Sequence, residues 1–339
     1  MKRAKIITLT LLLSIIFSLA IAYMIPSTDN YSPDNPFWNG LKTLKNTANM
    51  TEITSITQLK QIITPEKTAI LILGPEKPFT PQETQTIKEI LEKGATVLVA
   101  DDFGQANTLL EQLEIPCKFT QHLLVDPVFY YKNRKLPKIF HIKNTTWTKN
   151  VEELTLNYAT TLNITSTEIK ILANSSEYSY LDINMNDQWD PEEPKGSQPI
   201  LAQTNIGEGN LILLSDPSIF INSMISKSDN TQLLKNIVKG KTVYLDLSHY
   251  KTTPHTKIKT AIQIALNFIY VPEVKYTLVA ATTIITLYTT RKTKEKEEME
   301  EVDEIEEILK KHPNWDRKIL EKLREWREKF GTNRTTQNT

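Results

Sequence analysis

The chain has little of what disulfide-stabilised, nucleotide-binding or nucleic-acid-binding proteins depend on. A single cysteine, Cys117, excludes an intramolecular disulfide and a zinc site built from several thiolates. Nine glycines in 339 residues, without a G-x-G-x-x-G or G-x-x-x-x-G-K-S/T pattern, leave no phosphate-binding loop of the familiar kinds. Because 40 basic residues balance 40 acidic ones, we expect no nucleic-acid partner.

Apolar residues gather near both ends of the chain. No charged residue occurs between Ile6 and Met24, and a helix of this length spans about 28 Å at roughly 1.5 Å per residue, close to a hydrocarbon core. The sequence therefore predicts a membrane anchor over residues 1–24. A cleaved signal peptide is the alternative, because Ala20-Ile21-Ala22 is an acceptable cleavage site.

The second apolar segment, residues 274–290, is less hydrophobic. Its threonine hydroxyls can bond back to helix carbonyls, and Lys275 near one end can extend its ammonium to the headgroups. We interpret it as a second transmembrane helix. The alternative is a buried last helix of the domain that precedes it.

Basic residues flank both apolar segments on the sides away from the region between them. The positive-inside rule then places both chain ends in the cytoplasm and residues 25–273 outside the cell membrane. Five N-x-S/T sequons in that region suit an exported glycoprotein, although such triplets also arise by chance. The basic residues are Lys2, Arg3, Lys5, Arg291, Lys292, Lys294 and Lys296. The sequons begin at Asn30, Asn49, Asn144, Asn163 and Asn174.

The region between the apolar segments alternates strand and helix patterns. Residues 68–74 and 95–102 are short apolar runs, each followed by a helical pattern, over 81–93 and 105–113. The alternation predicts right-handed crossovers and a mostly parallel, flavodoxin-like sheet. The same pattern returns as strand then helix over 210–222, helix over 230–238, strand over 242–250 and helix over 258–268. Between about 119 and 205 only β-type stretches occur, which we interpret as a β-rich insertion.

Several of these segments resemble a known family. They are IGEGNLILLSDPSIFIN, the dipeptide Asp229-Asn230, TVYLDLSHY, TAILILG and EILEKGATVLVADD. The chain is similar to uncharacterised membrane-anchored proteins of archaea and bacteria, a domain of unknown function with a class I glutamine-amidotransferase-like fold. The resemblance covers about two thirds of the exported region. It implies genes that are often close to those of MoxR-type AAA ATPases and of partners with a von Willebrand-like domain.

Catalysis does not follow from the resemblance. True class I amidotransferases place a nucleophilic cysteine on a sharp strand-to-helix turn beside a histidine. Cys117 follows Ile115-Pro116 without a G-x-C-x-G elbow, so we predict a buried inert thiol and no enzyme of this type.

Polar residues at the carboxyl ends of the predicted strands are the candidates for a ligand crevice. A Ser215, His249 and Asp246 triad is conceivable there, but no spacing requires it. The alternative is structural, because Asp216 before Pro217 suits a helix N-cap, as do Asp229 or Asn230 for the next helix. The crevice candidates are Asp101, Asp102, Ser215, Asp216, Asp246, Ser248 and His249.

Residues 182–193 have the spacing of a twelve-residue calcium loop, with oxygen ligands at positions 1, 3, 5, 7, 9 and 12. Asp187 replaces the glycine usual at position 6, and the alternative is an acidic solvated turn. If calcium binds, we expect a structural ion. The ligands would be Asp182, Asn184, Asn186, the Gln188 carbonyl, Asp190 and Glu193.

The tail, residues 291–339, predicts two amphipathic helices separated at Pro313. They can pack on each other as a hairpin or place the second apolar stripe in a partner's groove. That stripe is Ile319, Leu323, Trp326 and Phe330. Three functions remain: a noncatalytic membrane-anchored adaptor or sensor, a surface hydrolase or sugar-processing enzyme, and a passive envelope protein.

Overall fold

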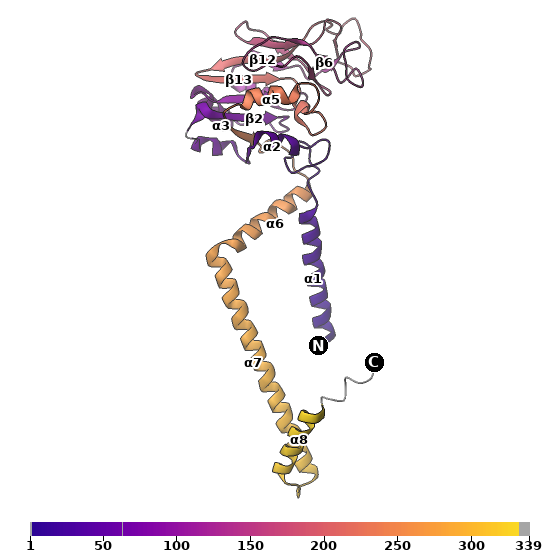
Figure 1. Cartoon of the computed structure of the whole chain (residues 1–339), viewed down its shortest axis with the longest axis vertical. Helices are drawn as coiled ribbons and strands as arrows, with labels where there is room; N and C mark the ends of the chain where they lie inside the picture. The colour runs from indigo at the N-terminus through magenta and orange to yellow at the C-terminus, as the bar shows by residue number, and fades with distance from the viewer. Residues whose placement is uncertain (1, 63, 332–339) are drawn as a thin grey trace. The chain divides into compact units, whose positions relative to one another are not determined.

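The computed structural model describes residues 2–62 and 64–331 (Figure 1). Internal contacts divide the chain into two units, one up to Thr260 and one from Ala261 onward. The first unit holds the N-terminal helix and the α/β head. The second holds the helical part of the chain from Ala261 onward.

A sheet of eight strands forms the centre of the head. Five neighbouring strands run parallel, and every residue of β2 and β3 is buried because helices cover both faces. In order these strands are β1 (Thr51–Ile53), β14 (Thr242–Asp246), β2 (Thr68–Leu73), β3 (Thr96–Ala100) and β13 (Gly209–Leu214).

The β-rich region extends the same sheet. Beyond β13 the order continues with β12 (Pro199–Ile206), β10 (Lys170–Asn174) and β7 (His141–Ile142), all paired antiparallel. The β12–β13 turn requires Gly207, because a Cβ there would lie 2.6 Å from the Glu92 Cα. The sheet is therefore mixed, and the predicted insertion supplies its antiparallel edge.

Six further short strands pair outside the main sheet. Their pairs are β4 (Cys117–Phe119) with β9 (Leu162–Ile164), β5 (Leu123–Val125) with β11 (Tyr180–Asp182), and β6 (Lys138–Ile139) with β8 (Leu154–Thr155).

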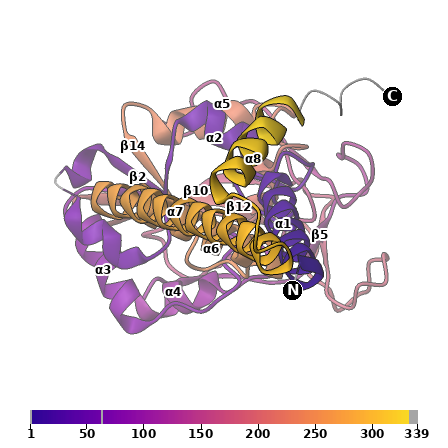
Figure 2. The same ribbon diagram turned by 90° about the horizontal axis from the view of Figure 1, so that it is seen from below.

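Alternate side chains of β2 and β3 enter two separate cores, one on each face of the sheet. Ile70 and Ile72 pack toward α3 (Pro81–Glu92) and α4 (Ala106–Gln112), whereas Leu71 and Leu73 pack toward the opposite face. That opposite core includes α2 (Lys42–Ala48) and α5 (Asn230–Val238). Figure 2 shows α3 and α4 on one side of the strands and α2 and α5 on the other. Three short 3-10 helices complete the head: η1 (Ile56–Gln61), η2 (Pro65–Lys67) and η3 (Pro217–Phe220).

The helix expected directly after β13 is η3, which is only four residues long. Asp216 caps it and Pro217 occupies its first position, as the local sequence predicts. The chain then turns before α5, so the motif ends in a short 3-10 turn rather than an α-helix.

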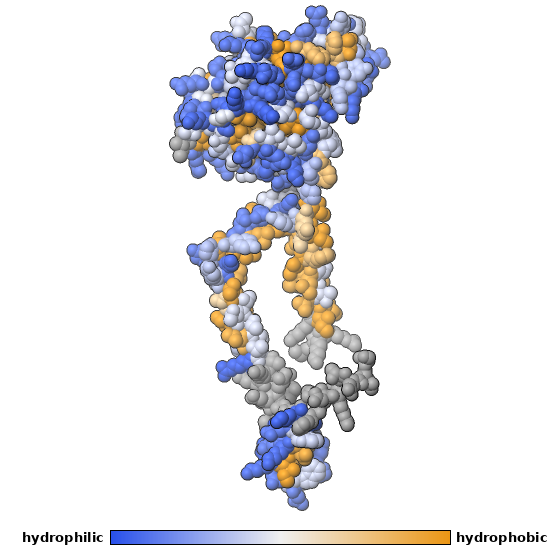
Figure 3. Space-filling view, viewed as in Figure 1, coloured by the Kyte–Doolittle hydropathy of each residue, from blue (hydrophilic) through white to orange (hydrophobic). Residues whose placement is uncertain are grey.

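The N-terminal helix α1 (Lys2–Met24) contains the apolar run Ile6–Met24, whose mean hydropathy is 2.4 and whose residues lie outside the core (Figure 3). Among the described residues it is the one helix that is long and apolar enough by itself to cross a membrane. The helices α6 (Pro254–Tyr270) and α7 (Pro272–Lys311) pass the same test only as a bent pair, with an angle of 78°.

The helix predicted over 258–268 is present as part of α6, but no residue of α6 is buried. It therefore does not cover the sheet as the last helix of an α/β layer would. The apolar segment 274–290 lies inside α7, which continues without a break into the tail.

The tail forms a helical hairpin. The helix α8 (Arg317–Gly331) packs against the end of α7, with Arg327 Nη2 3.3 Å from Glu304 Oε2 and Ile305 buried. The break between the two helices covers residues 312–316 and includes Pro313. The predicted stripe stays exposed, at 58% for Ile319, 57% for Leu323 and 65% for Trp326. The Phe330 side chain lies outside the described residues.

The two ends of the head meet beside each other. His255 Nε2 lies 2.9 Å from the Ala22 carbonyl oxygen, and the Thr256 hydroxyl lies 3.3 Å from that of Ser27. The end of α1 and the start of α6 are thus joined by hydrogen bonds at one point of the first unit.

Candidate functional site

Asp101 follows β3 and is completely buried. Its Oδ1 accepts hydrogen bonds from the backbone N–H groups of Asp102 and Gly104, and its Oδ2 accepts one from Ala106. A Cβ at Gly104 would lie 2.4 Å from Asp101 Oδ1, so only glycine permits this close approach. Burial raises the pKa of Asp101 to about 7 despite the three donors. Its carboxyl group therefore shapes the loop that leads into α4.

Asp216 has the same kind of role at the end of β13. Its Oδ1 accepts from the Ser218 N–H at 2.7 Å, and its Oδ2 accepts from the Asn157 N–H at 2.6 Å. Burial raises the pKa of Asp216 well above its ordinary value, and the nearby Asp102 carboxylate adds to the effect. The side chain joins η3 to the β-rich region as well as capping it.

Two tyrosine rings pack near these aspartates, at the end of β2 and beside η3. The Tyr31 hydroxyl lies 2.8 Å from Ser218 Oγ, and its ring stacks on that of Tyr250 with centroids 6.1 Å apart. The Tyr250 hydroxyl donates to the Leu73 carbonyl at the end of β2. A Cβ at Gly74 would lie 3.1 Å from the Tyr31 ring. Aromatic side chains thus pack where a ligand of an open α/β sheet usually binds.

The end of β14 forms a second cluster. His249 Nδ1 donates to Asp246 Oδ2 at 2.6 Å, and the Ser248 hydroxyl donates to Asp246 Oδ1. The imidazole stacks on Phe79, with centroids 3.7 Å apart, and its Nε2 lies 3.7 Å from Glu83 Oε2. This orientation directs the histidine toward the start of α3.

The sheet order separates the two clusters. Strands β2 and β3 lie between β14 and β13, so three strand spacings, about 14 Å, separate their ends. The structure therefore brings Asp101, Asp102 and Asp216 together but places His249 away from Ser215. Ser215 is buried, and its Oγ has no hydrogen-bond partner among the described residues.

Cys117 lies in β4 with 2% of its surface exposed. Burial raises the pKa of its thiol to about 12. A thiol with this pKa leaves only about one thiolate in 100,000 at pH 7, so it is a poor nucleophile.

The dipeptide Asp229-Asn230 fixes the β-rich region to α5. Asp229 Oδ2 accepts from the N–H groups of Glu152 and Glu153. The Asn230 amide both accepts from and donates to the backbone of Thr155. Asp229 occupies the N-cap position without a side-chain cap bond, so its role is to hold this loop.

The calcium-type loop follows β11. Asp182 is 1% exposed and Glu193 is 7% exposed. Asp182 accepts from the Asn186 and Asp187 N–H groups, and Glu193 accepts from the Ile183 and Asp190 N–H groups. These hydrogen bonds close the loop over its two terminal carboxylates.

Position 6 of the loop has the backbone conformation that calcium loops require. Asp187 has a φ of +65°, and its side chain pairs with Lys135 Nζ at 2.9 Å. The amides of Asn184 and Asn186 donate to Asp190 Oδ2. Within the described ranges, no three His, Cys, Asp or Glu side chains are grouped closely enough to hold a metal ion by themselves.

The sequons differ in access. Asn30, Asn49, Asn144 and Asn163 are exposed. Asn174 is half-buried in β10, which pairs with β12 on one side and β7 on the other.

Sequence reasoning missed the side chains that contact these candidates. Tyr31 and Phe79 are far in sequence from their contacts at Ser218 and His249. The Thr80–Glu83 capping box at the start of α3 was the one local pattern that could have drawn attention to Glu83.

Taken together, the mixed sheet and the capped, tyrosine-covered strand ends define a two-sided α/β domain. The family profile described as "Domain of unknown function (DUF4350)" matches residues 33–238. The chain belongs to this family. The comparison with curated proteins gave no match.

Solved structures include more distant likenesses. The mmIFT52 N-terminal domain is 17% identical with a TM-score of 0.48, covering 62% of this chain and 94% of that domain. A ThuA-like protein from Bacteroides uniformis is 14% identical with a TM-score of 0.34, covering 56% and 74%. A cytoplasmic protein from Salmonella typhimurium LT2 is 12% identical with a TM-score of 0.35, covering 58% and 84%.

Proposed function

We propose that the chain is a noncatalytic adaptor or sensor of the cell membrane, with an extracytoplasmic head and a cytoplasmic helical tail. The observation that carries the proposal is the packing of Tyr31 and Tyr250 over the strand ends, beside aspartates whose oxygens bind backbone N–H groups. Such packing is typical of a rigid structural domain and not of a reaction site.

The chemistry of the candidate nucleophiles supports the same conclusion. Acyl or glycosyl transfer needs a nucleophile activated by a base or by a lowered pKa. Ser215 lies about three strand spacings from His249, and burial raises the pKa of Cys117. The proposed function therefore includes the fold of the amidotransferases but not their cysteine chemistry.

Membrane attachment rests on the apolar run of α1 and on the basic residues around it. The bent pair α6–α7 is the proposed second crossing, with the apolar part of α7 at its centre. Both chain ends would then be cytoplasmic, and the exposed sequons would lie on the outer side.

The tail supplies the proposed partner site. Ile319, Leu323 and Trp326 stay exposed after α8 packs against α7, and a face of large apolar side chains usually marks a contact surface. The family resemblance suggests a MoxR-type ATPase as the cytoplasmic partner.

Site-specific crosslinking in native membranes tests this proposal. A photoreactive residue at Leu323 of the full-length chain should give an adduct with a MoxR-type ATPase. The same residue at Glu325, which is exposed on another face of α8, is the matched control. Equal adducts from both positions, or no ATPase adduct from Leu323, would overturn the tail assignment.

A surface hydrolase is the second candidate, favoured by two observations. The pKa of Asp101 near 7 is typical of a general acid or base, and the Ser215 hydroxyl lacks a partner in the described structure. Hydrolysis of a glycoside or ester that Ser215→Ala and Asp101→Asn both abolish, in stably folded chains, would replace the adaptor proposal.

Calcium at residues 182–193 is part of the proposal as a structural ion. Two nearly buried carboxylates, Asp182 and Glu193, are costly to ionise, and calcium would add to the positive charge that Lys135 supplies near Asp182. The spacing of the oxygen-bearing residues and the left-handed backbone at Asp187 support the assignment.

A further inference from the structure

A hollow opens on the head at the edge that the β-rich region forms. Its volume is about 640 Å³, within the range of about 300–1,000 Å³ typical of ligand pockets. One wall is the loop that follows β7, with Asn144, Thr145 and Trp147, and the other is the turn after α5. None of the candidate site residues at the strand ends lines this hollow.

The wall is held in place before any ligand arrives. The Asn236 amide on α5 donates to the carbonyl oxygens of Trp147 and Lys149, at 3.0 and 2.8 Å. The Thr148 hydroxyl is buried and donates to the Lys143 carbonyl. Trp147 is half-buried and packs against the core, so its indole has a fixed orientation.

Charge in the hollow has one sign. Lys149, Lys239 and Lys241 line it, and no Asp or Glu belongs to its described lining. Lys241 donates to the Glu66 carbonyl, whereas Lys149 and Lys239 are exposed. Two ammonium groups thus remain for an anion, beside hydroxyl and amide side chains.

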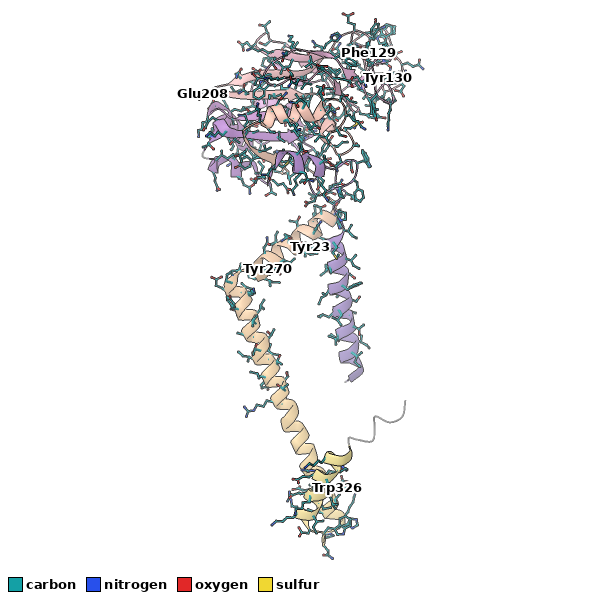
Figure 4. All side chains as sticks on the ribbon, in the orientation of Figure 1. Tyr23, Phe129, Tyr130, Glu208, Tyr270 and Trp326 are labelled. Atoms are coloured by element: carbon teal, nitrogen blue, oxygen red, sulfur yellow. The ribbon has the colours of Figure 1, made fainter. Side chains whose placement is uncertain are left out.

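A second hollow of about 370 Å³ adjoins the first, and Asn144 lines both. Its lining includes Phe140, which packs edge-to-face on Phe129 with ring centroids 5.6 Å apart. The ring centroids of Phe129 and Tyr178 lie 6.1 Å apart, and all three residues are at least 39% exposed. Figure 4 shows Phe129 on the surface of the β-rich region. Each hollow thus has an aromatic residue in its lining, Trp147 in the first and Phe140 in the second.

We propose that the two adjoining hollows act as one groove that binds an acidic polysaccharide, with its carboxylates at Lys149 and Lys239 and its sugar rings on Trp147 and Phe140. Indole and phenyl faces suit the C–H faces of sugar rings, and amides and hydroxyls suit sugar hydroxyls. The inference gives the proposed sensor a ligand class, but it requires only the folded head.

An acidic peptide fits the groove less well. An extended peptide gains most of its affinity by adding a strand to a sheet edge, and the edge strand β7 has only two residues.

Calorimetry on the full-length chain in neutral-lipid nanodiscs tests the proposal. Tetragalacturonate should bind, neutral cellotetraose should bind at least tenfold more weakly, and hexaglutamate should not compete. Lys149→Ala combined with Lys239→Ala should weaken tetragalacturonate binding at least tenfold. Lys88→Ala combined with Lys93→Ala, at exposed lysines of α3 and its end, should leave it unchanged.

The proposal is wrong if tetragalacturonate does not bind, if hexaglutamate binds equally well, or if both double variants bind alike.

Discussion

At the scale of single residues, Asp101 shows how a buried charge can organise a loop. Its two oxygens bind three backbone N–H groups, and each bond favours the ionised form. Burial opposes ionisation more strongly, so the pKa rises from its ordinary value of 3.8 to about 7. The neighbouring aspartates Asp102 and Asp216 also have raised pKa values, chiefly through burial.

This shift predicts that acid stabilises the head relative to neutral pH. Between about pH 4 and 7 the folded state holds a proton on Asp101 that the unfolded chain has lost, so the free energy of unfolding falls as pH rises. A shift of roughly three units corresponds to a loss of up to about 4 kcal/mol. Denaturant unfolding from pH 4 to 8 measures it.

The control separates Asp101 from its neighbours. Asp101→Asn should flatten part of the pH profile, leaving the slope due to Asp102 and Asp216. Glu177→Gln, at an exposed carboxylate, should leave the whole slope unchanged. Parallel profiles for Asp101→Asn and the unchanged chain would contradict the assigned pKa.

At the scale of elements, the loop after β11 has the backbone shape of a calcium-binding loop, but Asp187 disfavours that shape. Asp187 adopts a φ of +65°, where glycine has no steric cost. Asp187→Gly should therefore strengthen calcium binding, and the lost ion pair with Lys135 costs little because Asp187 is 44% exposed.

Thermal unfolding of the full-length chain with and without calcium measures this effect. Calcium should raise the melting temperature, more so in Asp187→Gly, and Asp182→Ala with Glu193→Ala should abolish the increase. An equal increase in the double variant would show that the ion binds elsewhere.

Local patterns predicted the elements whose boundaries depend on local chemistry. The apolar runs gave β2 and β3 within two residues, and the Pro81 start and Gly94 end gave α3. They could not show that the β-rich region joins the main sheet, because antiparallel pairing at long range leaves no local periodicity. The sequence predicts a longer helix where the four-residue η3 occurs, because an Asp-Pro pair can start either an α-helix or a 3-10 helix.

The candidate site was predictable only in part for the same reason. Aspartates that follow apolar runs lie at strand ends, so Asp101 and Asp216 could be grouped from the sequence. Which strand ends are neighbours depends on the sheet order, and this order places His249 away from Ser215. Tyr31 comes from a loop that precedes every strand, and nothing near it in sequence indicates its contact with Ser218.

At the scale of the whole molecule, the proposed topology makes a direct prediction. Protease added to intact cells should cut the exposed region around Asn144, whereas an epitope at Trp326 should stay protected by the membrane. Detergent lysis is the control, since it should expose both. Loss of the Trp326 epitope without lysis would place the tail outside.

The hydrogen bonds that join the end of α1 to the start of α6 have a mechanical consequence. Both connections of the head leave from one point, so tension between them is carried by the short contacts at His255 and Ser27 rather than by the strands of the sheet. The head is in this respect a domain inserted between two helices. A different domain with equally close termini could be exchanged for it without altering how those helices leave the junction.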